Sequence, residues 1–270
     1  MTGKQFITFL SDFGLTDDFV GTCHGVIKTI APDVEILDIT HGIKAHDILQ
    51  GALVLEQTLP YMPPGVILAV VDPGVGVDRR PLALRTAQDR YLVGPDNGLL
   101  SLAAARLGGV EDAVELTCSS YSLPRVCKTF EGRDLFSPAA AHLCNGVPID
   151  KLGQHVPVGE LAQIELPAPV LEAESVTATV VYIDSFGNIQ LCLTSDELEG
   201  AGIRRGHELE VTYNDETWRV PFVFAFADVE PESLLLYEDS YQRITFAMNQ
   251  GNAAHIFQVR QGDQINLRPA

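Results

Sequence analysis

Basic residues are scarce in this sequence. Lys and Arg together number 18 against 36 Asp and Glu, so the formal net charge of the 270-residue chain is −18. Nucleic acids and anionic membranes both require a positively charged protein surface, and this balance argues against either as a partner. A cationic small molecule is compatible with such a chain, although acidic composition does not by itself identify one.

Paired cysteines and long apolar runs are also missing. The cysteines are five, an odd number, and none form a CxxC pair, so neither a disulfide framework nor a zinc site is expected. We expect small buried side chains at most of them: Cys23, Cys118, Cys127, Cys144 and Cys192. No apolar run approaches the roughly 20 residues of a membrane-spanning helix. The first residues reach a turn too early for a secretion signal, which predicts a cytoplasmic protein.

Sequence motifs for phosphate and metal binding are absent as well. The Gly-Val-Gly turn of "DPGVG" matches neither the GxxxxGK[ST] nor the GxGxxG pattern. His41, His46 and His142 show no spacing typical of metal ligands. His24 falls in the middle of a predicted helix, where a surface or hydrogen-bonded histidine is commoner than a ligand. The sequence therefore predicts no metal and no bound cofactor.

The hydrophobic pattern changes along the chain and indicates two domains. Apolar runs typical of buried strands alternate with helical patterns over residues 1–153, which predicts an α/β sandwich domain with a mainly parallel sheet. Residues 154–174 are Pro-rich without helical period and read as a linker. Short alternating runs over residues 175–270 predict a smaller all-β barrel or sandwich domain, with a hairpin turn in "YNDET".

Acidic residues follow several of the predicted parallel strands. "FLSDFG" brings Asp12, "DITHG" brings Asp38, and "VVDPGVG" brings Asp72. One acid at a strand end is usually a turn former. Three of them at neighbouring strand ends favour a ligand site, because ligands of open α/β sheets bind beyond the carboxyl ends of the strands. Arg79 follows Asp72 by seven positions, and this pair is either a structural ion pair or part of an active site.

Other polar clusters are ambiguous from their spacing alone. "FEGRD" places Glu131 and Asp134 just before a predicted helix, where Asp134 either caps or charges the helix start or reaches the strand-end crevice. In the β domain, a tight turn would by itself explain Asp184 and Asn188 in "DSFGN". Ser240 lies in "YEDSYQ", where nothing in the spacing demands a ligand.

The chain resembles one family along its whole length, the S-adenosylmethionine hydroxide adenosyltransferases, which are relatives of fluorinase and chlorinase. The motifs that carry the resemblance occur in order: "SDFG", "VDPGVG" with a following Arg, "PDNGLL", "GRD-x-F-x-PAAAHL", "D-x-FGN" and "NQGNAA". The resemblance implies an N-terminal α/β domain, a C-terminal β-barrel and S-adenosylmethionine as substrate. It also implies a homotrimer in which substrate binds where one subunit meets the next.

The resemblance further implies a role for each matching residue. Asp72 and Arg79 match two members of a catalytic Asp-Arg-His triad. Asp12 matches a ribose-binding aspartate, and Asp184 and Asn188 match groups that hold the methionine and base portions of the substrate. Ser240 matches a serine that contacts the methionine carboxylate. Ala254 lies in the segment that touches adenine.

The sequence departs from the family at the third triad position, where Glu131 stands in place of the histidine. Glu131 would either accept a proton from water, form an ion pair with Arg79, or mark a protein that only binds its ligand. The expected activity is hydrolysis of S-adenosylmethionine to adenosine and methionine, with Asp72, Arg79 and Glu131 as catalytic residues. The alternatives are a chlorinase-like halogenase and a binding protein with little turnover.

Overall fold

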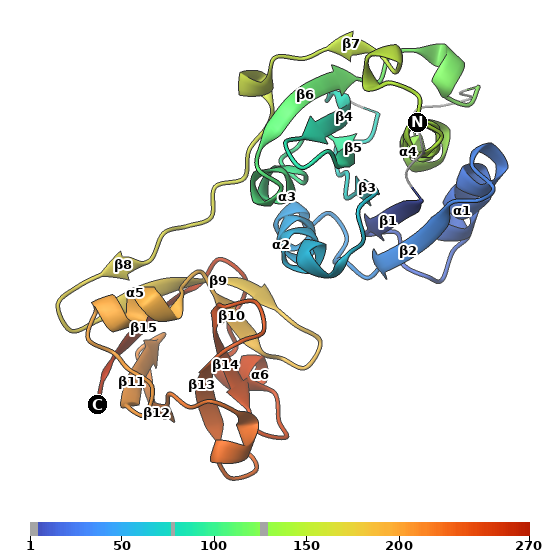
Figure 1. Ribbon diagram of the computed structural model, residues 1–270. Coiled ribbons are helices and arrows are strands. Elements are labelled where there is room, and N and C mark those ends of the chain that lie inside the picture. Colours follow the sequence, from blue (N-terminus) through green and yellow to red (C-terminus); the bar gives the residue numbers. More distant parts are fainter. Residues whose placement is uncertain (1–4, 77–78, 125–128) are drawn as a thin grey trace. The chain divides into compact units, whose positions relative to one another are not determined.

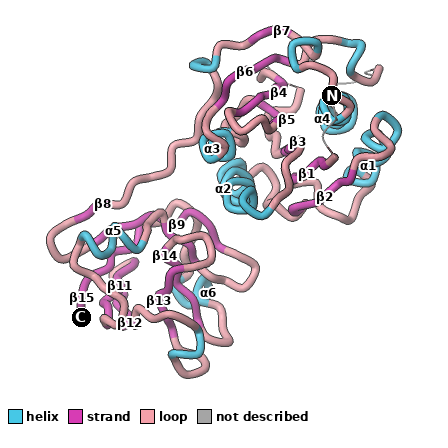
Figure 2. Tube along the Cα trace, in the orientation of Figure 1, coloured by secondary structure: helices cyan, strands magenta, loops and turns pink. Residues whose placement is uncertain are grey.

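The computed structural model describes residues 5–76, 79–124 and 129–270, which form two compact units (Figure 1). The units are Met1–Ile164 and Glu165–Ala270. The first is an α/β domain and the second is built mainly from strands, with only short helices (Figure 2). The predicted fold class is therefore confirmed.

A seven-stranded mixed sheet forms the centre of the first unit, in the order β2-β1-β3-β5-β4-β6-β7. Neighbours among β2, β1, β3 and β5 run parallel, and β4, β6 and β7 extend this parallel core with antiparallel pairs. The strands are β1 Phe6–Ser11, β2 Glu35–Thr40, β3 Val66–Val70, β4 Pro81–Thr86, β5 Tyr91–Pro95, β6 Val110–Glu115 and β7 Gln154–His155. Every residue of β3 is buried, as its uninterrupted apolar run predicts.

Helices cover both faces of this sheet. One apolar core joins α1 (Phe19–Ile30) and α4 (Ser137–Cys144) to one face, and a second joins α2 (Ile48–Thr58) and α3 (Ser101–Arg106) to the other. A π-helical segment, η3 (Gly132–Phe136), leads directly into α4. Short 3₁₀ turns complete the unit: η1 Leu59–Tyr61, η2 Ser119–Tyr121, η4 Ile149–Lys151 and η5 Val158–Glu160.

The segment expected as a linker over residues 154–174 differs in the structure. Its first eleven residues belong to the first unit, because β7 pairs with β6 and backbone N–H groups bind that unit's side chains. Ala162 N–H donates to Asp96 Oδ1 at 2.8 Å, and Ile164 N–H donates to Ser101 Oγ at 3.1 Å. Further on, β8 (Val170–Leu171) pairs with β9. Pro-rich composition excluded a helix here but carried no information about these non-local hydrogen bonds.

The second unit is a nearly closed antiparallel barrel, with strand order β12-β11-β15-β9-β10-β14-β13. A bridge between Phe222 and Leu236 joins the two ends of this order. Asn214 and Asp215, both at positive φ, form the predicted hairpin turn. The elements are β9 Val176–Ile183, β10 Ile189–Leu191, α5 Ser195–Gly200, β11 Glu208–Tyr213, β12 Glu216–Pro221, η6 Phe226–Asp228, β13 Leu234–Glu238, β14 Ile244–Met248, α6 Ala253–Phe257 and β15 Gln264–Pro269.

The burial of the cysteines and the short length of the helices agree with what the sequence predicts. Cys23, Cys144 and Cys192 are buried free thiols and Cys118 is a half-buried one, whereas Cys127 lies outside the described residues. Burial raises the pKa of the Cys23 thiol to about 11. In the described part of the chain, no helix is both long and apolar enough to cross a membrane.

Candidate active site

The acids that follow β1 and β3 lie at the same edge of the sheet, as the sequence predicts. The two strands are parallel neighbours, with Ser11 paired to Val70. Asp12 follows directly, and its N–H donates to the Val70 carbonyl at 3.3 Å. Its carboxylate accepts a hydrogen bond from His46 N–H at 3.0 Å, which holds the next loop of the chain against it. Asp72 follows β3 by two residues.

Asp72, Arg79 and Glu131 form one ion-paired cluster. Arg79 Nε donates to Asp72 Oδ2 at 2.9 Å, and Arg79 Nη2 donates both to that oxygen and to Glu131 Oε2. All three side chains are largely shielded from solvent, with exposed fractions of 6% for Asp72, 11% for Arg79 and 7% for Glu131. Of the roles considered for Glu131, the ion pair with Arg79 is therefore the observed arrangement.

Aromatic packing aims Glu131 at Arg79. Phe13, from the "SDFG" motif, packs edge-to-face against Phe130 with ring centroids 6.0 Å apart. A Cβ atom at Gly132 would lie only 2.8 Å from Phe13 Cζ, so any other residue there would displace the Phe13 ring. The chain then enters the π-helical turn η3, whose Phe136 ring lies 5.5 Å from the Arg79 guanidinium carbon. The "SDFG" and "FEGRD" motifs thus hold each other in place.

The cluster carries an excess of negative charge, because two carboxylates share one guanidinium. Burial lowers the pKa of Arg79, but hydrogen bonds and charge from Asp72, and then from Glu131, more than offset burial and raise it above its ordinary value. Arg79 therefore stays cationic. Asp72 Oδ1 is buried and accepts no hydrogen bond among the described residues, so this oxygen keeps an unused acceptor position.

A cavity of about 860 Å³ reaches Arg79 and Glu131, although not Asp72. This volume lies within the range of small-molecule sites in proteins. Its other lining residues mix polar and apolar side chains: Gly76, Arg80, Pro81, Glu115, Leu116, Thr117, Cys118, Ser119, Ser122, Leu123, Pro124 and Leu135. Two members of the cluster therefore face a space of ligand size.

Three polar residues near the cluster form ion pairs outside it: Arg80, Arg133 and Asp134. Arg80 binds Asp96 Oδ2 at 2.8 Å and Glu160 Oε2 at 3.1 Å, so it ties the segment after β7 to the sheet. Asp134 lies in the first turn of η3, where it adds charge to the helix start, and it is not the N-cap, which is Glu131. It is buried and pairs with its neighbour Arg133, with Nη2 to Oδ2 at 2.9 Å.

The second unit gathers three predicted binding residues around one cavity of about 290 Å³: Asp184, Asn188 and Ser240. Asp184 Oδ1 accepts hydrogen bonds from the N–H groups of Phe186 and Asn188, both at 2.9 Å. Asn188 Nδ2 also donates to Asp184 Oδ2 at 2.7 Å. These bonds shape the "DSFGN" turn and present its side chains to the cavity.

Ala254 belongs to a segment that packs against this turn rather than lining the cavity. Its N–H donates to the Gly187 carbonyl at 3.0 Å. Gly187 adopts a φ of +84°, and a Cβ atom there would lie 2.1 Å from Asn252 Oδ1. The "DSFGN" and "NQGNAA" motifs are therefore complementary surfaces, and glycine is required where they meet.

Sequence reasoning missed six residues with polar side chains that line the same cavity: Tyr182, Gln190, Tyr237, Asp239, Tyr241 and Thr245. Asp239 Oδ2 accepts hydrogen bonds from Gln190 Nε2 at 2.6 Å and Thr245 Oγ1 at 2.9 Å. Burial, followed by the charges of Asp239 and Asp184, raises the pKa of Tyr237 to about 12. The signal was present in the sequence, since Tyr237 and Asp239 share one face of an alternating strand pattern.

Comparison with known families identifies the chain. A model of the SAM hydroxide adenosyltransferase N-terminal domain matches residues 7–153, and one of the C-terminal domain matches residues 178–266. The chain belongs to the SAM hydroxide adenosyltransferase family. The resemblance carried by the motifs is thereby confirmed for both domains of this family member.

Several full-length relatives of this family member are known. The (R)-S-adenosyl-L-methionine hydrolase of Salinispora arenicola is 43% identical over 269 residues, covering 99% of each chain. The hydrolase of the same name from Thermus thermophilus is 34% identical, covering 97% of this chain and 98% of its own. The fluorinase of Actinopolyspora mzabensis is 26% identical, covering 98% and 97%. The crystal structure of an uncharacterized conserved protein from Thermotoga maritima superposes with a TM-score of 0.90 at 33% identity, covering 97% and 99%.

Proposed function

We propose that this protein hydrolyses S-adenosyl-L-methionine to adenosine and L-methionine. The observation that carries the proposal is the largely shielded Arg79, held by Asp72 and Glu131 beside an unengaged carboxylate oxygen. The 43% identity to a hydrolase that acts on this substrate supports the same reaction. An acidic protein also suits a substrate that carries a sulfonium and an ammonium group.

The reaction is a displacement at the ribose 5′-carbon. A water oxygen forms a bond to this carbon while the carbon–sulfur bond breaks, and the electron pair leaves with the methionine thioether. The water loses one proton, so the positive charge of the sulfonium ends as a proton in solution. A sulfonium leaves readily, and the protein's task is to hold the water in line in a site that excludes other solvent.

Each residue of the cluster has its own part in this task. Asp72 Oδ2 orients Arg79 through Nε and Nη2, which fixes the guanidinium as a donor to the water oxygen. Asp72 Oδ1, which has no partner among the described residues, accepts the water's proton. Glu131 supports Arg79 from the other side and adds a negative charge that disfavours halide anions.

The substrate's other groups would be held by the remaining residues that match the family. Asp12 would bind the ribose, and Ser240 the methionine carboxylate. Asp184 and Asn188 would hold the methionine and base portions, with the segment of Ala254 against adenine. Their grouping around the second unit's cavity supports this assignment for Asp184, Asn188 and Ser240.

We extend the proposal to a homotrimer whose sites combine residues from different subunits. Large apolar side chains at the surface support association, since Phe186 and Phe224 are each 75% exposed. Light scattering coupled to gel filtration should give three times the mass of one chain, and a monomeric mass would contradict this part of the proposal.

Incubation with S-adenosylmethionine, followed by chromatography, tests the activity. We expect adenosine and methionine in equal amounts, and in oxygen-18 water the label should enter the 5′-hydroxyl of adenosine. Arg79→Lys should lower kcat on the order of 10²- to 10³-fold, because lysine lacks the planar donor fork. Arg85→Lys, the control, should leave kcat within a few-fold, because Arg85 pairs with Glu111 and does not line the cavity.

Two outcomes would overturn the proposal in favour of its alternatives. Formation of chloro-adenosine from chloride faster than adenosine would identify a halogenase. Calorimetric binding of S-adenosylmethionine with neither product would identify a binding protein, in which Glu131 has disabled the triad.

A further inference from the structure

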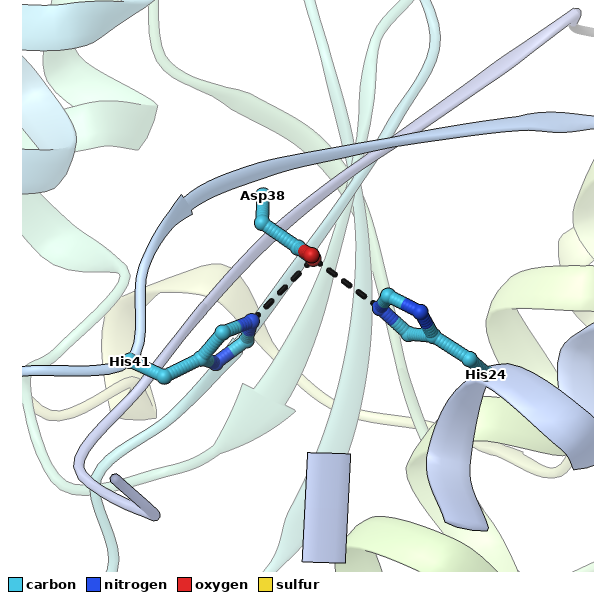
Figure 3. A group of neighbouring side chains, drawn as sticks. All are labelled: His24, Asp38 and His41. Carbon is cyan, nitrogen blue, oxygen red and sulfur yellow. Dashed lines mark hydrogen bonds and ion pairs between the residues drawn. The ribbon is translucent and has the colours of Figure 1, made fainter. Parts of the chain in front are cut away.

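Two histidines from different elements converge on one carboxylate oxygen near the carboxyl ends of β1 and β2 (Figure 3). His24 lies on α1, Asp38 on β2, and His41 directly after β2. Asp38 Oδ1 is 3.0 Å from His24 Nε2 and 3.1 Å from His41 Nε2. All three atoms lie within 4.8 Å of one another.

From this convergence we propose a binding site for a divalent transition-metal ion of the zinc class. The ligands are His24 Nε2, Asp38 Oδ1 and His41 Nε2, with water completing the coordination. Two imidazoles and one carboxylate are a donor set suited to such ions, and three protein ligands leave a position open. The proposal is independent of the proposed hydrolase activity, because none of the three residues belongs to that site.

The separations fit an ion of this size. With bonds of roughly 2.0–2.2 Å, tetrahedral ligand atoms lie about 3.3 Å apart. The two distances to Asp38 Oδ1 are within a few tenths of an ångström of this value. The two imidazole nitrogens lie within 4.8 Å of each other, and the His24 side chain, which is 31% exposed, is the one with room to rotate toward the ion.

The surroundings of His41 point to a ligand. Its side chain is 2% exposed, and its Nε2 atom is buried without a hydrogen bond of acceptable geometry, despite the approach of Asp38. An imidazole nitrogen in that state destabilises a metal-free protein. A cation between the three ligand atoms would satisfy it.

The other nitrogen of His41 has the support typical of a metal-binding histidine. His41 Nδ1 lies 2.7 Å from Ser11 Oγ, and with Nε2 on the metal the proton resides on Nδ1 and is donated to that oxygen. Phe9 packs edge-to-face on the His41 ring at 4.7 Å between centroids, which fixes its plane. The side chain of Asp38 is 38% exposed, so an ion can reach the site from solvent on this side.

Titration of the chelator-treated protein with Co²⁺ and Zn²⁺ tests this site directly. We expect one ion per chain by calorimetry and a visible Co²⁺ spectrum without the near-ultraviolet band of thiolate ligation. His24→Gln, Asp38→Asn and His41→Gln should each weaken binding by about 100-fold or more, and Ser11→Ala by about 10- to 100-fold. His155→Gln is the control, because His155 also lies near a carboxylate, 3.4 Å from Asp112, but without a third ligand.

The result that overturns the proposal is equally direct. It fails if saturable one-to-one binding is absent, or if binding persists unchanged in His24→Gln and Asp38→Asn. These two residues are partly exposed, so their variants should remain folded even where His41→Gln does not. Thermal unfolding in chelator establishes the folding of each variant before metal is added.

Discussion

The charge of Glu131 should decide how strongly the site discriminates against chloride. Glu131→Gln keeps the shape of the side chain and an oxygen that accepts from Arg79 Nη2, but it removes one negative charge from the cluster. The net charge of Asp72, Arg79 and residue 131 then changes from −1 to zero. A neutral cluster should admit an anion beside the guanidinium more readily.

The size of this effect follows from the contact between Glu131 and Arg79. An anion bound at the free edge of the guanidinium would lie on the order of 6 Å from the Glu131 carboxylate. At an effective dielectric constant of about 20, that repulsion amounts to about 2.8 kcal/mol, or roughly 100-fold in relative affinity. We expect the ratio of chloro-adenosine to adenosine to rise by at least about tenfold.

Chromatography of both products at fixed chloride and fixed ionic strength measures this ratio. Glu160→Gln is the matched control, because Glu160 also pairs with an arginine but is 61% exposed and lies outside the cluster. Chloride NMR line broadening reports anion binding even if Glu131→Gln abolishes turnover. An unchanged product ratio together with unchanged chloride binding would refute the electrostatic reasoning.

Two further predictions concern the second unit. Gly187→Ala should destabilise the protein by at least about 1–3 kcal/mol in thermal unfolding, because φ is +84° and the new methyl group would meet Asn252. Gly200→Ala, where a Cβ meets nothing within 4 Å, should be neutral or slightly stabilising; equal effects would contradict this account. Because the pKa of folded Tyr237, about 12, exceeds the ordinary value of 10, its contribution to stability should be present below pH 10 and lost as the pH rises to 12. Tyr237→Phe should reduce the loss of stability between pH 10 and 12, and it should remove one high-pH tyrosine ionisation from the ultraviolet titration. Tyr61→Phe, the control, should leave that ionisation in place.

The elements of the fold were predictable because their signals are local. The uninterrupted apolar run at β3 and the Asn214–Asp215 turn each contain within a few residues the pattern that produces them. The extent of the linker was not predictable, because Ala162 and Ile164 find their hydrogen-bond acceptors on Asp96 and Ser101, more than sixty positions away. The composition of a segment indicates which backbone conformations it prefers. It does not indicate which distant acceptor a backbone N–H group will bind.

The same distinction applies to the two clusters of side chains. The motifs of the sequence by themselves determined the family, the α/β and barrel domains, and Asp72 with Arg79 as a pair, since those two residues are only seven positions apart. Only the tertiary structure decided that Glu131 points at Arg79, because Phe13 must pack against Gly132 to aim it. Only the tertiary structure brought His24 and His41 to Asp38, across a helix and a strand whose linear spacing predicts no site. Side chains far apart in sequence meet through the packing of whole elements, and that packing depends on the complete core.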